Sequence, residues 1–297
     1  MTSLKSIFQY ILAAMVLFTV AACSDDDDNI VLGGDGPSGE VFVTGDVPSR
    51  LEVPALKAGN QLIAHWTNDY KGKVLNYCLE YDYDKYHSRW VAFRFDGTTA
   101  EKRVQRKSYD IKPQYPKDPE LKRNYIEDDR SFNGHDHGHL CASHDRLYSR
   151  DGNDQTFYMT NMSPQKASFN QKYWTKFENH VQTLGRDRSF ADTLYVVKGG
   201  TIADGQFSGR VANNRIVVPN YYFIALLKVK NNTYSSIGFW VSHTNYDAGQ
   251  SDKKALREKA VSIKELERLT GIDFFHNLPD KIEEQVEKSY SLSAWGL

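Results

Sequence analysis

The chain has 297 residues, of which 40% are hydrophobic and 25% are charged, with a formal net charge of −1. It shows no internal repeat and no second break in composition, which argues against a repeat protein or a second domain. The charge is uneven, because the first 40 residues hold six acidic residues and one Lys, leaving 36 Lys and Arg against 32 Asp and Glu. This mildly basic remainder neither requires nor excludes a polyanionic partner, for which a local basic patch matters more.

The N-terminus has the plan of a secretory signal, with Lys5 followed by a mostly apolar run from Ile7 to Val20. This run is shorter than a transmembrane helix, which needs about 20 apolar residues. It ends in Val20-Ala21-Ala22-Cys23, which resembles a bacterial lipobox. We therefore expect residues 1–22 to be a lipoprotein signal peptide, with cleavage before Cys23 and lipid on its thiol. A plain signal peptide that happens to contain Cys is the alternative.

Residues 23–43 are expected to form a flexible tether. Four consecutive acidic residues, Asp25 to Asp28, follow the lipobox, and Gly33 to Gly39 is rich in Gly. The acidic run resembles the export signal of surface lipoproteins in some Gram-negative bacteria, and a merely solvated tether is the alternative. The expected location is a lipid anchor in the bacterial outer membrane, on the cell surface or otherwise on the periplasmic face. About 250 residues, 44–297, remain for a single domain with a substantial core.

The domain begins with strand signals. Residues Val74 to Tyr83 and Arg89 to Phe95 are rich in aromatic and β-branched residues and predict a β-hairpin. Gln155 to Met159 is read as another short strand. A helix is expected to open at Phe169 or Asn170, because apolar residues then recur at helical spacing until Gly185, which is expected to end it. These apolar residues are Trp174, Phe177, Val181 and Leu184.

Three more strands are predicted, at Asp192–Val197, Tyr221–Val229 and Ser236–Val241. Ser262 with Glu265 three residues later predicts the start of a helix that Gly271 ends, and Asp280–Lys288 is a further helix. Adjacent strands with helices inserted between them indicate an α+β domain on a mainly antiparallel central sheet. Cys78 and Cys141 either form a disulfide or remain buried free thiols, and the sequence leaves this open.

The segment from Asn133 to Glu178 holds the residues best suited to chemistry. It contains Asp136-His137-Gly138-His139, then Asn161-Met162-Ser163-Pro164-Gln165, then Asn170-Gln171-Lys172-Tyr173-Trp174, and finally Glu178. An imidazole, a side-chain amide and a carboxylate thus fall where a turn leads into a helix. Phosphodiester hydrolysis needs a base for water, an oxygen-rich seat for a hard cation and charge neutralisation at the phosphate, and this segment offers candidates for all three.

These motifs resemble those of the DNA/RNA non-specific endonucleases with the ββα-metal fold, to which endonuclease G belongs. The family signature reads Asp-Arg-Gly-His, Asn-x-x-Pro-Gln and Asn-Gln-x-x-Trp, with a Glu eight residues after the second Asn. Order and spacing agree here, and the resemblance covers roughly residues 60 to 285. Its further segments are Trp90–Phe93, Arg106 before Ser108–Asp110, and Leu266–Phe275. It implies a metal-dependent endonuclease that cuts DNA, RNA or both with little sequence preference.

Site residues follow from the matched positions. His139 matches the general base, and an imidazole titrating near pH 6.5 can accept a proton from water. Asn170 matches the direct protein ligand to the metal, for which Mg²⁺ is expected and Mn²⁺ is an alternative. Glu178, about 80° around the helix from Asn170, is placed to hold a metal-bound water. Asn161 is expected to orient the site through hydrogen bonds.

Phosphate contacts are assigned to Arg. Arg106 matches an Arg that contacts the phosphate near the transition state, and its planar, permanently charged fork suits that task. Arg146 is a second candidate. Arg106 also belongs to a possible basic patch with Lys102, Arg103 and Lys107, for which a solvated loop is the plainer interpretation. Trp174 is expected in the core rather than against a base.

His137 departs from the family pattern, because it stands where the family has Arg. An imidazole is shorter and only partly protonated at neutral pH, so charge stabilisation at the phosphate should be weaker or depend on acid pH. This departure motivates one alternative, a surface lipoprotein of the same fold that binds nucleic acid with weak or no cleavage. The alternation of His135, His137 and His139 suggests another, a zinc site like that of metallo-β-lactamase-like hydrolases, although the Asp-His pair of that motif is missing.

Overall fold

The computed structural model describes residues 29–32, 41–44, 46–69, 72–122, 132–246 and 249–297. Its strands are β1 (Asn29–Leu32), β2 (Val41–Thr44), β3 (Gln61–Asp69), β4 (Gly72–Asp82), β5 (His87–Phe95), β6 (Asp136–His139), β7 (Met162–Gln165), β8 (Thr193–Gly200), β9 (Phe207–Val211), β10 (Ile216–Pro219), β11 (Tyr221–Lys230), β12 (Thr233–Ser242) and β13 (Ala260–Val261). Its α-helices are α1 (Arg150–Gln155), α2 (Thr175–Arg186), α3 (Asp252–Lys259), α4 (Ile263–Thr270) and α5 (Asp280–Lys288).

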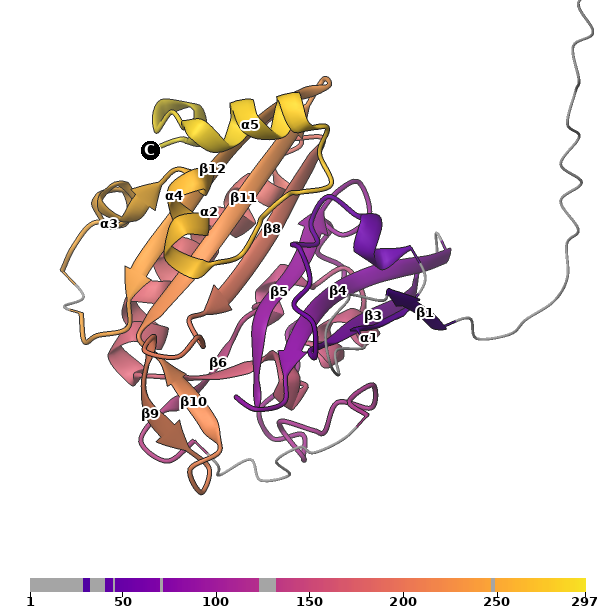
Figure 1. Ribbon diagram of the computed structural model, residues 1–297, viewed down its shortest axis with the longest axis vertical. Coiled ribbons are helices and arrows are strands. Elements are labelled where there is room, and N and C mark those ends of the chain that lie inside the picture. Colours follow the sequence, from indigo (N-terminus) through magenta and orange to yellow (C-terminus); the bar gives the residue numbers. More distant parts are fainter. Residues whose placement is uncertain (1–28, 33–40, 45, 70–71, 123–131, 247–248) are drawn as a thin grey trace, which may run out of the picture.

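One large sheet organises these elements, in the strand order β1-β2-β3-β4-β5-β8-β11-β12-β13 (Figure 1). Its neighbours are antiparallel except β2 and β3, which meet in parallel at Phe42 and Gln61. β6–β7 and β9–β10 form separate two-stranded sheets. The predicted hairpin is confirmed as β4–β5, where Cys78 lies opposite Ala92, and the three later strands are confirmed as β8, β11 and β12. The α+β prediction on a mainly antiparallel sheet is therefore confirmed.

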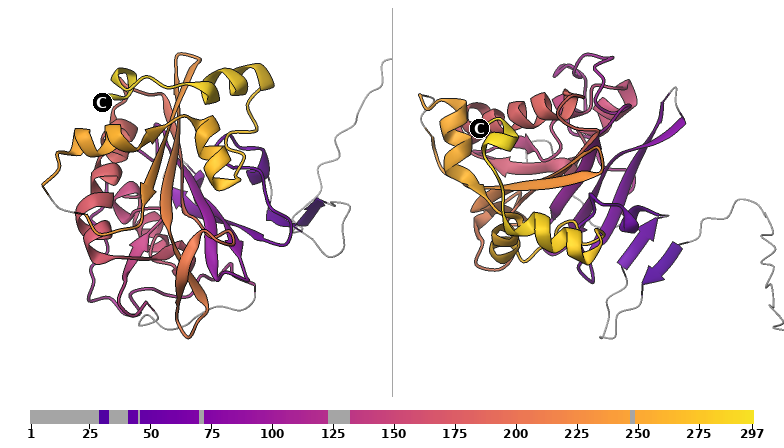
Figure 2. Two further views of the ribbon diagram at one scale, coloured as in Figure 1. Left: turned by 60° about the vertical axis from the view of Figure 1, so that its left-hand side comes forward. Right: turned by 90° about the horizontal axis from the view of Figure 1, so that it is seen from above.

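The sheet is covered on both faces, and strand alternation sorts its side chains into two cores. Along β11, Tyr222, Ile224 and Leu226 point into one core, while Phe223, Ala225 and Leu227 point into the other. Helix α2 covers the first face, and α4 and α5 cover the second (Figure 2). The candidate catalytic segment lies on the α2 side, because β6 leads into the core that α2 completes.

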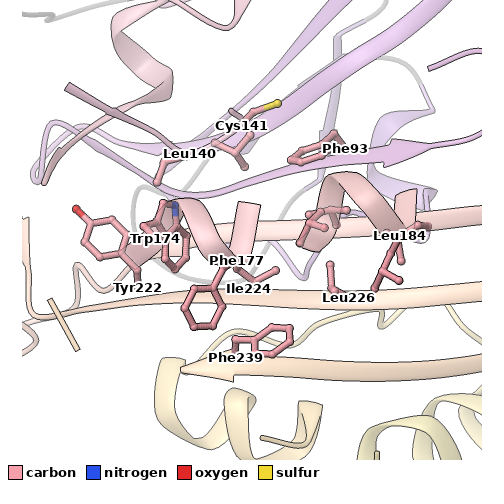
Figure 3. Packing of buried hydrophobic residues seen from close by; sticks show 14 of the residues in the cluster. Phe93, Leu140, Cys141, Trp174, Phe177, Leu184, Tyr222, Ile224, Leu226 and Phe239 are labelled. Carbon is pink, nitrogen blue, oxygen red and sulfur yellow. The ribbon is translucent and has the colours of Figure 1, made fainter. Parts of the chain in front are cut away.

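Helix α2 carries its apolar stripe as the spacing predicts, with Phe177 and Val181 fully buried. Trp174 and Phe177 lie against Ile224 and Phe239 of the sheet (Figure 3). The helix begins at Phe169, but its first turn, Phe169–Trp174, is π-helical. The expectation that Gly185 ends the helix is wrong, since α2 continues to Arg186. A Cβ atom at Gly185 would collide with the Phe95 ring, so Gly serves close helix–sheet packing there.

Two other expectations need correction, those for Gln155–Met159 and for the tether. Gln155 to Met159 is not a strand, because the Ser149 hydroxyl accepts the Gly152 N–H at 3.0 Å and starts helix α1. Cys78 and Cys141 are free, buried thiols, and they lie in the cores on opposite faces of the sheet. Within the expected tether, β1 and β2 pair antiparallel, so strand structure begins before residue 44.

The C-terminal helices agree with the sequence. Ser262 caps α4 by accepting the Glu265 N–H at 3.1 Å, and Gly271 ends it with a φ of 64°. Helix α5 spans Asp280–Lys288 as predicted. Across the described ranges, no helix combines the length and apolar character needed to cross a membrane. Residues 1–22, Cys23 and the acidic run lie outside those ranges.

Candidate active site

A polar cleft of about 510 Å³ opens on the α2 side of the sheet. It brings together five of the six residues selected from the sequence and leaves out Asn161. The five are Arg106, His137, His139, Asn170 and Glu178. They come from three segments that are distant in the chain: the loop before β6, strand β6 itself, and the π-helical turn that continues into α2.

Strand β6 fixes the position of His139. Its pairing with β7 places His139 opposite Met162 and His137 opposite Pro164. Gly138 between them is required by space, since a Cβ atom there would collide with the Gln165 side chain. The two flanking imidazoles therefore lie two residues apart on a short, tightly packed strand whose other side has no room for a side chain.

Asn161 acts on the backbone next to this strand. Its side-chain oxygen accepts the Cys141 N–H at 2.8 Å, and its amide donates to the carbonyl oxygens of Cys141 at 2.9 Å and Thr156 at 2.6 Å. With its side chain fully buried and its amide hydrogen bonds satisfied, Asn161 holds the chain two residues after His139. Its contacts suit orientation of the site, and they leave it without contact with the cleft.

The His139 ring is half-buried where it lines the cleft. Phe157 meets it edge-on, with ring centroids 5.0 Å apart, and its Nε2 has no hydrogen-bond partner among the described residues. Burial, followed by the positive charge of Arg106 and the neighbouring His137 and His144, lowers the pKa of His139 to about 3. The imidazole is therefore unprotonated throughout the neutral range, as a proton acceptor must be.

Asn170 is oriented by a carboxylate. Its Nδ2 donates to Asp136 Oδ2 at 3.0 Å, and the amide of Gln171 donates to the same oxygen at 2.8 Å. Because a carboxylate only accepts, this bond assigns the nitrogen of the Asn170 amide to Asp136 and leaves the amide oxygen for another partner. Asp136 therefore sets the direction in which Asn170 offers its oxygen.

Glu178 lies at the start of α2 beside a buried ion pair. Lys198 Nζ is 2.8 Å from Asp145 Oδ2, and both side chains are completely buried. Burial raises the pKa of Glu178 to about 7, while the positive charge of Lys198 opposes that rise. Burial lowers the pKa of Lys198, but Asp145 and Glu178 outweigh it and the net shift is upward. Lys198 therefore places a buried, positively charged ammonium group near the Glu178 carboxylate.

The two Arg candidates have different environments. Arg106 lines the cleft, donates from Nε to Ser143 Oγ at 2.9 Å and lies over the Tyr109 ring, 3.9 Å from its centroid. Arg146 is fully buried, with its guanidinium 4.6 Å from the Phe93 ring centroid, so the alternative assignment of Arg146 to phosphate is wrong. The proposed basic patch is not uniform either, because Lys107 is buried.

His137 stacks between two aromatic rings. Tyr115 and Phe132 lie nearly parallel to it, with centroids 4.2 Å and 4.3 Å away. No sequence pattern predicts this stacking, because Tyr115 and Phe132 come from loops with no periodic pattern. Within the described residues, one group of three or more His, Cys, Asp or Glu side chains is close enough to share an ion. All its members are acidic, and none is a histidine. The triple-His zinc alternative is therefore not supported.

Comparison with known proteins agrees with this architecture. The model of the DNA/RNA non-specific endonuclease family matches residues 62–281. Nuclease C1 of Cunninghamella echinulata var. echinulata is 29% identical over 172 residues, which are 55% of this chain and 65% of that protein. The Nostoc protein named Nuclease is 27% identical over 221 residues, 71% of this chain and 75% of that protein. Human mitochondrial endonuclease G is 28% identical over 156 residues, 49% of this chain and 50% of that protein.

The first two of the curated relatives are matched over less than two thirds of their length, 65% for Nuclease C1 and 54% for mitochondrial Nuclease 1 of Schizosaccharomyces pombe. A chain from the crystal structure of the EndoG/EndoGI complex superposes with a TM-score of 0.59 at 19% identity, covering 74% of this chain and 89% of that one. That likeness shows a shared fold. Because the family model spans most of the chain, the protein belongs to the DNA/RNA non-specific endonuclease family.

Proposed function

We propose that this protein is a metal-dependent endonuclease that hydrolyses phosphodiester bonds in DNA, RNA or both without sequence preference. One observation carries the proposal. A single cleft gathers an unprotonated imidazole at His139, an amide oxygen at Asn170, a carboxylate at Glu178 and a guanidinium at Arg106. These groups provide a base, hard oxygen ligands and a permanent positive charge, which are the three requirements of the reaction.

The donor set of this cleft fits a hard divalent cation. Asp136 occupies the nitrogen of the Asn170 amide and so frees its oxygen, and Glu178 supplies a second oxygen group in the same cleft. Mg²⁺ prefers such ligands and keeps several waters, and Mn²⁺ suits the same set. Asn170 would hold the cation directly and Glu178 would act through water. When bound, the cation would supply neutralisation of charge on the phosphate and leaving oxygen.

The chain's own residues account for the remaining chemistry. His139 accepts the proton of the attacking water as that water bonds to phosphorus. The bond from phosphorus to the 3′ oxygen breaks, and the leaving oxygen takes a proton from water. Arg106 places a permanent positive charge beside the phosphate oxygens, with its orientation fixed by Ser143 and by Tyr109. Asp136 and Asn161 keep Asn170 and the His139 strand in place. These residues act on the phosphate, which is the same next to every base, so little base preference is expected.

Cleavage assays test this function directly. Purified protein is incubated with supercoiled plasmid and with single-stranded RNA, in Mg²⁺ and in EDTA. Internal nicking of the plasmid in Mg²⁺ alone supports the endonuclease. Retardation of both nucleic acids without any cleavage in Mg²⁺ or Mn²⁺ would instead favour the nucleic-acid-binding lipoprotein. RNA and DNA are tested at equal nucleotide concentration and fixed salt, because salt alone changes phosphate binding.

We further propose that the protein is a lipoprotein anchored through Cys23 in the outer membrane. The lipobox Val20–Cys23 and the acidic run that follows it support this location. Cys23→Ala should move the protein from the membrane fraction to the soluble fraction. A variant that stays in membranes would refute lipid anchoring.

A further inference from the structure

A second group of oxygen ligands lies on the opposite face of the sheet from the cleft, where α4 and α5 pack. Glu267 of α4, Asp273 of the following loop and Glu287 of α5 each offer a carboxylate oxygen, and the three oxygens lie within 4.8 Å of one another. Calcium–oxygen distances are about 2.3–2.6 Å, so two oxygens on opposite sides of one ion are about 5 Å apart. The spacing of the three carboxylates therefore suits one shared cation.

Glu287 is the buried member of this group, and one of its carboxylate oxygens is unsatisfied among the described residues. The residue is only 4% exposed, and its Oε1 has no hydrogen-bond partner within the described part of the chain. A buried carboxylate oxygen without a hydrogen-bond partner is costly, and a coordinated cation is one of the arrangements that removes the cost.

Lys264 does not neutralise the three carboxylates. Its Nζ lies 2.9 Å from Glu267 Oε2 but 3.8 Å from Glu287 Oε2, which is beyond hydrogen-bonding distance. Its side chain is 68% exposed, so it approaches from the solvent and can swing away. One Lys charge also leaves three carboxylates under-neutralised. Asp273 is exposed, so an ion and its waters can reach the group without opening the fold.

We propose that Glu267, Asp273 and Glu287 form a Ca²⁺ site with a structural role. Ca²⁺ fits better than Mg²⁺ because it accepts six to eight oxygens in irregular arrangements, whereas Mg²⁺ demands a near-octahedral set and is bound by one or two carboxylates. The ion would tie α5 to α4 and to their connecting loop. This site lies on a different face of the molecule from the cleft and does not depend on the proposed nuclease function.

The loop that would be fixed also holds the N-terminal part of the domain. The Asp273 carbonyl oxygen accepts the Ala55 N–H at 3.0 Å. Asn277 donates from its side chain to the carbonyl oxygens of Pro48 at 2.8 Å and Arg50 at 3.0 Å. An ion on Asp273 would therefore stabilise contacts between residues more than 200 positions apart, and the effect should be visible in global unfolding.

Thermal unfolding of the EDTA-treated full chain tests the site. We use an Asn170→Ala background, so that Ca²⁺ cannot act through the proposed active-site ligand. With a dissociation constant of about 10⁻⁴–10⁻³ M, 10 mM CaCl₂ should raise the Tm by roughly 3–10 °C. Calorimetric titration should show one Ca²⁺ per chain. A Tm that does not rise with Ca²⁺ overturns the proposal.

Two variants on one helix separate this site from general surface charge. Glu287→Gln should abolish the Ca²⁺-dependent rise in Tm, whereas Glu284→Gln, which removes an exposed charge on the same helix, should keep it. If Glu287→Gln does not fold, the exposed Asp273→Asn replaces it. A rise that survives loss of either ligand, or that Glu284→Gln also removes, overturns the site. With Asn170 intact, Glu287→Gln should leave the rate of nucleic-acid cleavage in Mg²⁺ within about twofold, because charges on the far side are screened over about 10 Å.

Discussion

Replacing Lys198 by Met should destabilise the protein strongly. Lys198 and Asp145 form a 2.8 Å ion pair with both side chains completely buried. Met has a similar length and no charge, so within the described structure the change leaves the paired oxygen of the buried Asp145 with the Ala142 N–H, at 3.1 Å, as its one remaining hydrogen-bond donor. Its other oxygen already has no hydrogen-bond partner among the described residues.

The expected loss follows from the geometry. Removing one member of a buried pair costs about 3–5 kcal/mol, because the remaining charge is uncompensated. For a domain of this size about 1 kcal/mol lowers Tm by roughly 2–4 °C, so the Tm should fall by roughly 6–20 °C. Lys230→Met is the matched control, because Lys230 makes a 2.9 Å ion pair with Asp192 on the protein surface. It should cost less than about 1 kcal/mol.

Equilibrium urea denaturation measures both variants and the double variant Lys198→Met with Asp145→Asn. The double variant should recover part of the loss, since it removes the unpaired charge as well. In the cleavage assay, loss of the Lys198 charge should raise the pKa of Glu178 further, so the rise of activity with pH should move to higher pH. A Lys198→Met variant no less stable than Lys230→Met would refute the reasoning.

Three further predictions concern the cleft. Asn170→Ala should abolish Mg²⁺-dependent cleavage, and EDTA should do the same to the parent; full cleavage in EDTA would contradict the cation assignment. Asp136→Ala should weaken the apparent Mg²⁺ affinity by about 10–100-fold with little loss of stability, because it releases the Asn170 amide, and an unchanged Mg²⁺ titration would refute that role. His137→Arg should extend cleavage to the alkaline side of the parent optimum, because a guanidinium stays charged where an imidazole loses its proton. Superimposable pH–rate profiles from about pH 5.5 to about pH 9.5 would instead make His137 a packing residue between Tyr115 and Phe132.

Regular elements with strong periodicity could be predicted from the sequence. The hairpin of β4 and β5, strands β8, β11 and β12, and helices α4 and α5 have clear alternation or capping signals. The strand predicted at Gln155–Met159 does not form, because the Ser149 cap starts helix α1 just before it. This local hydrogen bond outweighs a short apolar pattern. The position of Gly185 predicts a helix stop, whereas its close approach to Phe95 is a tertiary feature that no local pattern contains.

Motif spacing selected residues that share one cleft, but their supports come from elsewhere in the chain. Lys198 directly follows the strand predicted at Asp192–Val197, and the register of the longer strand β8 brings it to Asp145. The same holds for the stacking of Tyr115 on His137, which joins a loop to strand β6. Arg146 is buried although Arg is usually exposed, and its burial against Phe93 depends on how the sheet packs.

The most direct test of the catalytic account is the cleavage rate of His139→Ala. His139 is the unprotonated imidazole of the cleft, and a general base contributes about 10²–10⁴-fold to the rate. Single-turnover cleavage of plasmid in Mg²⁺ is compared for parent and variant at equal protein concentration, with thermal unfolding and nucleic-acid binding as controls. The account predicts a loss of at least about 100-fold, with binding and Tm close to those of the parent. A well-folded His139→Ala protein that cuts at a rate near the parent's would contradict it.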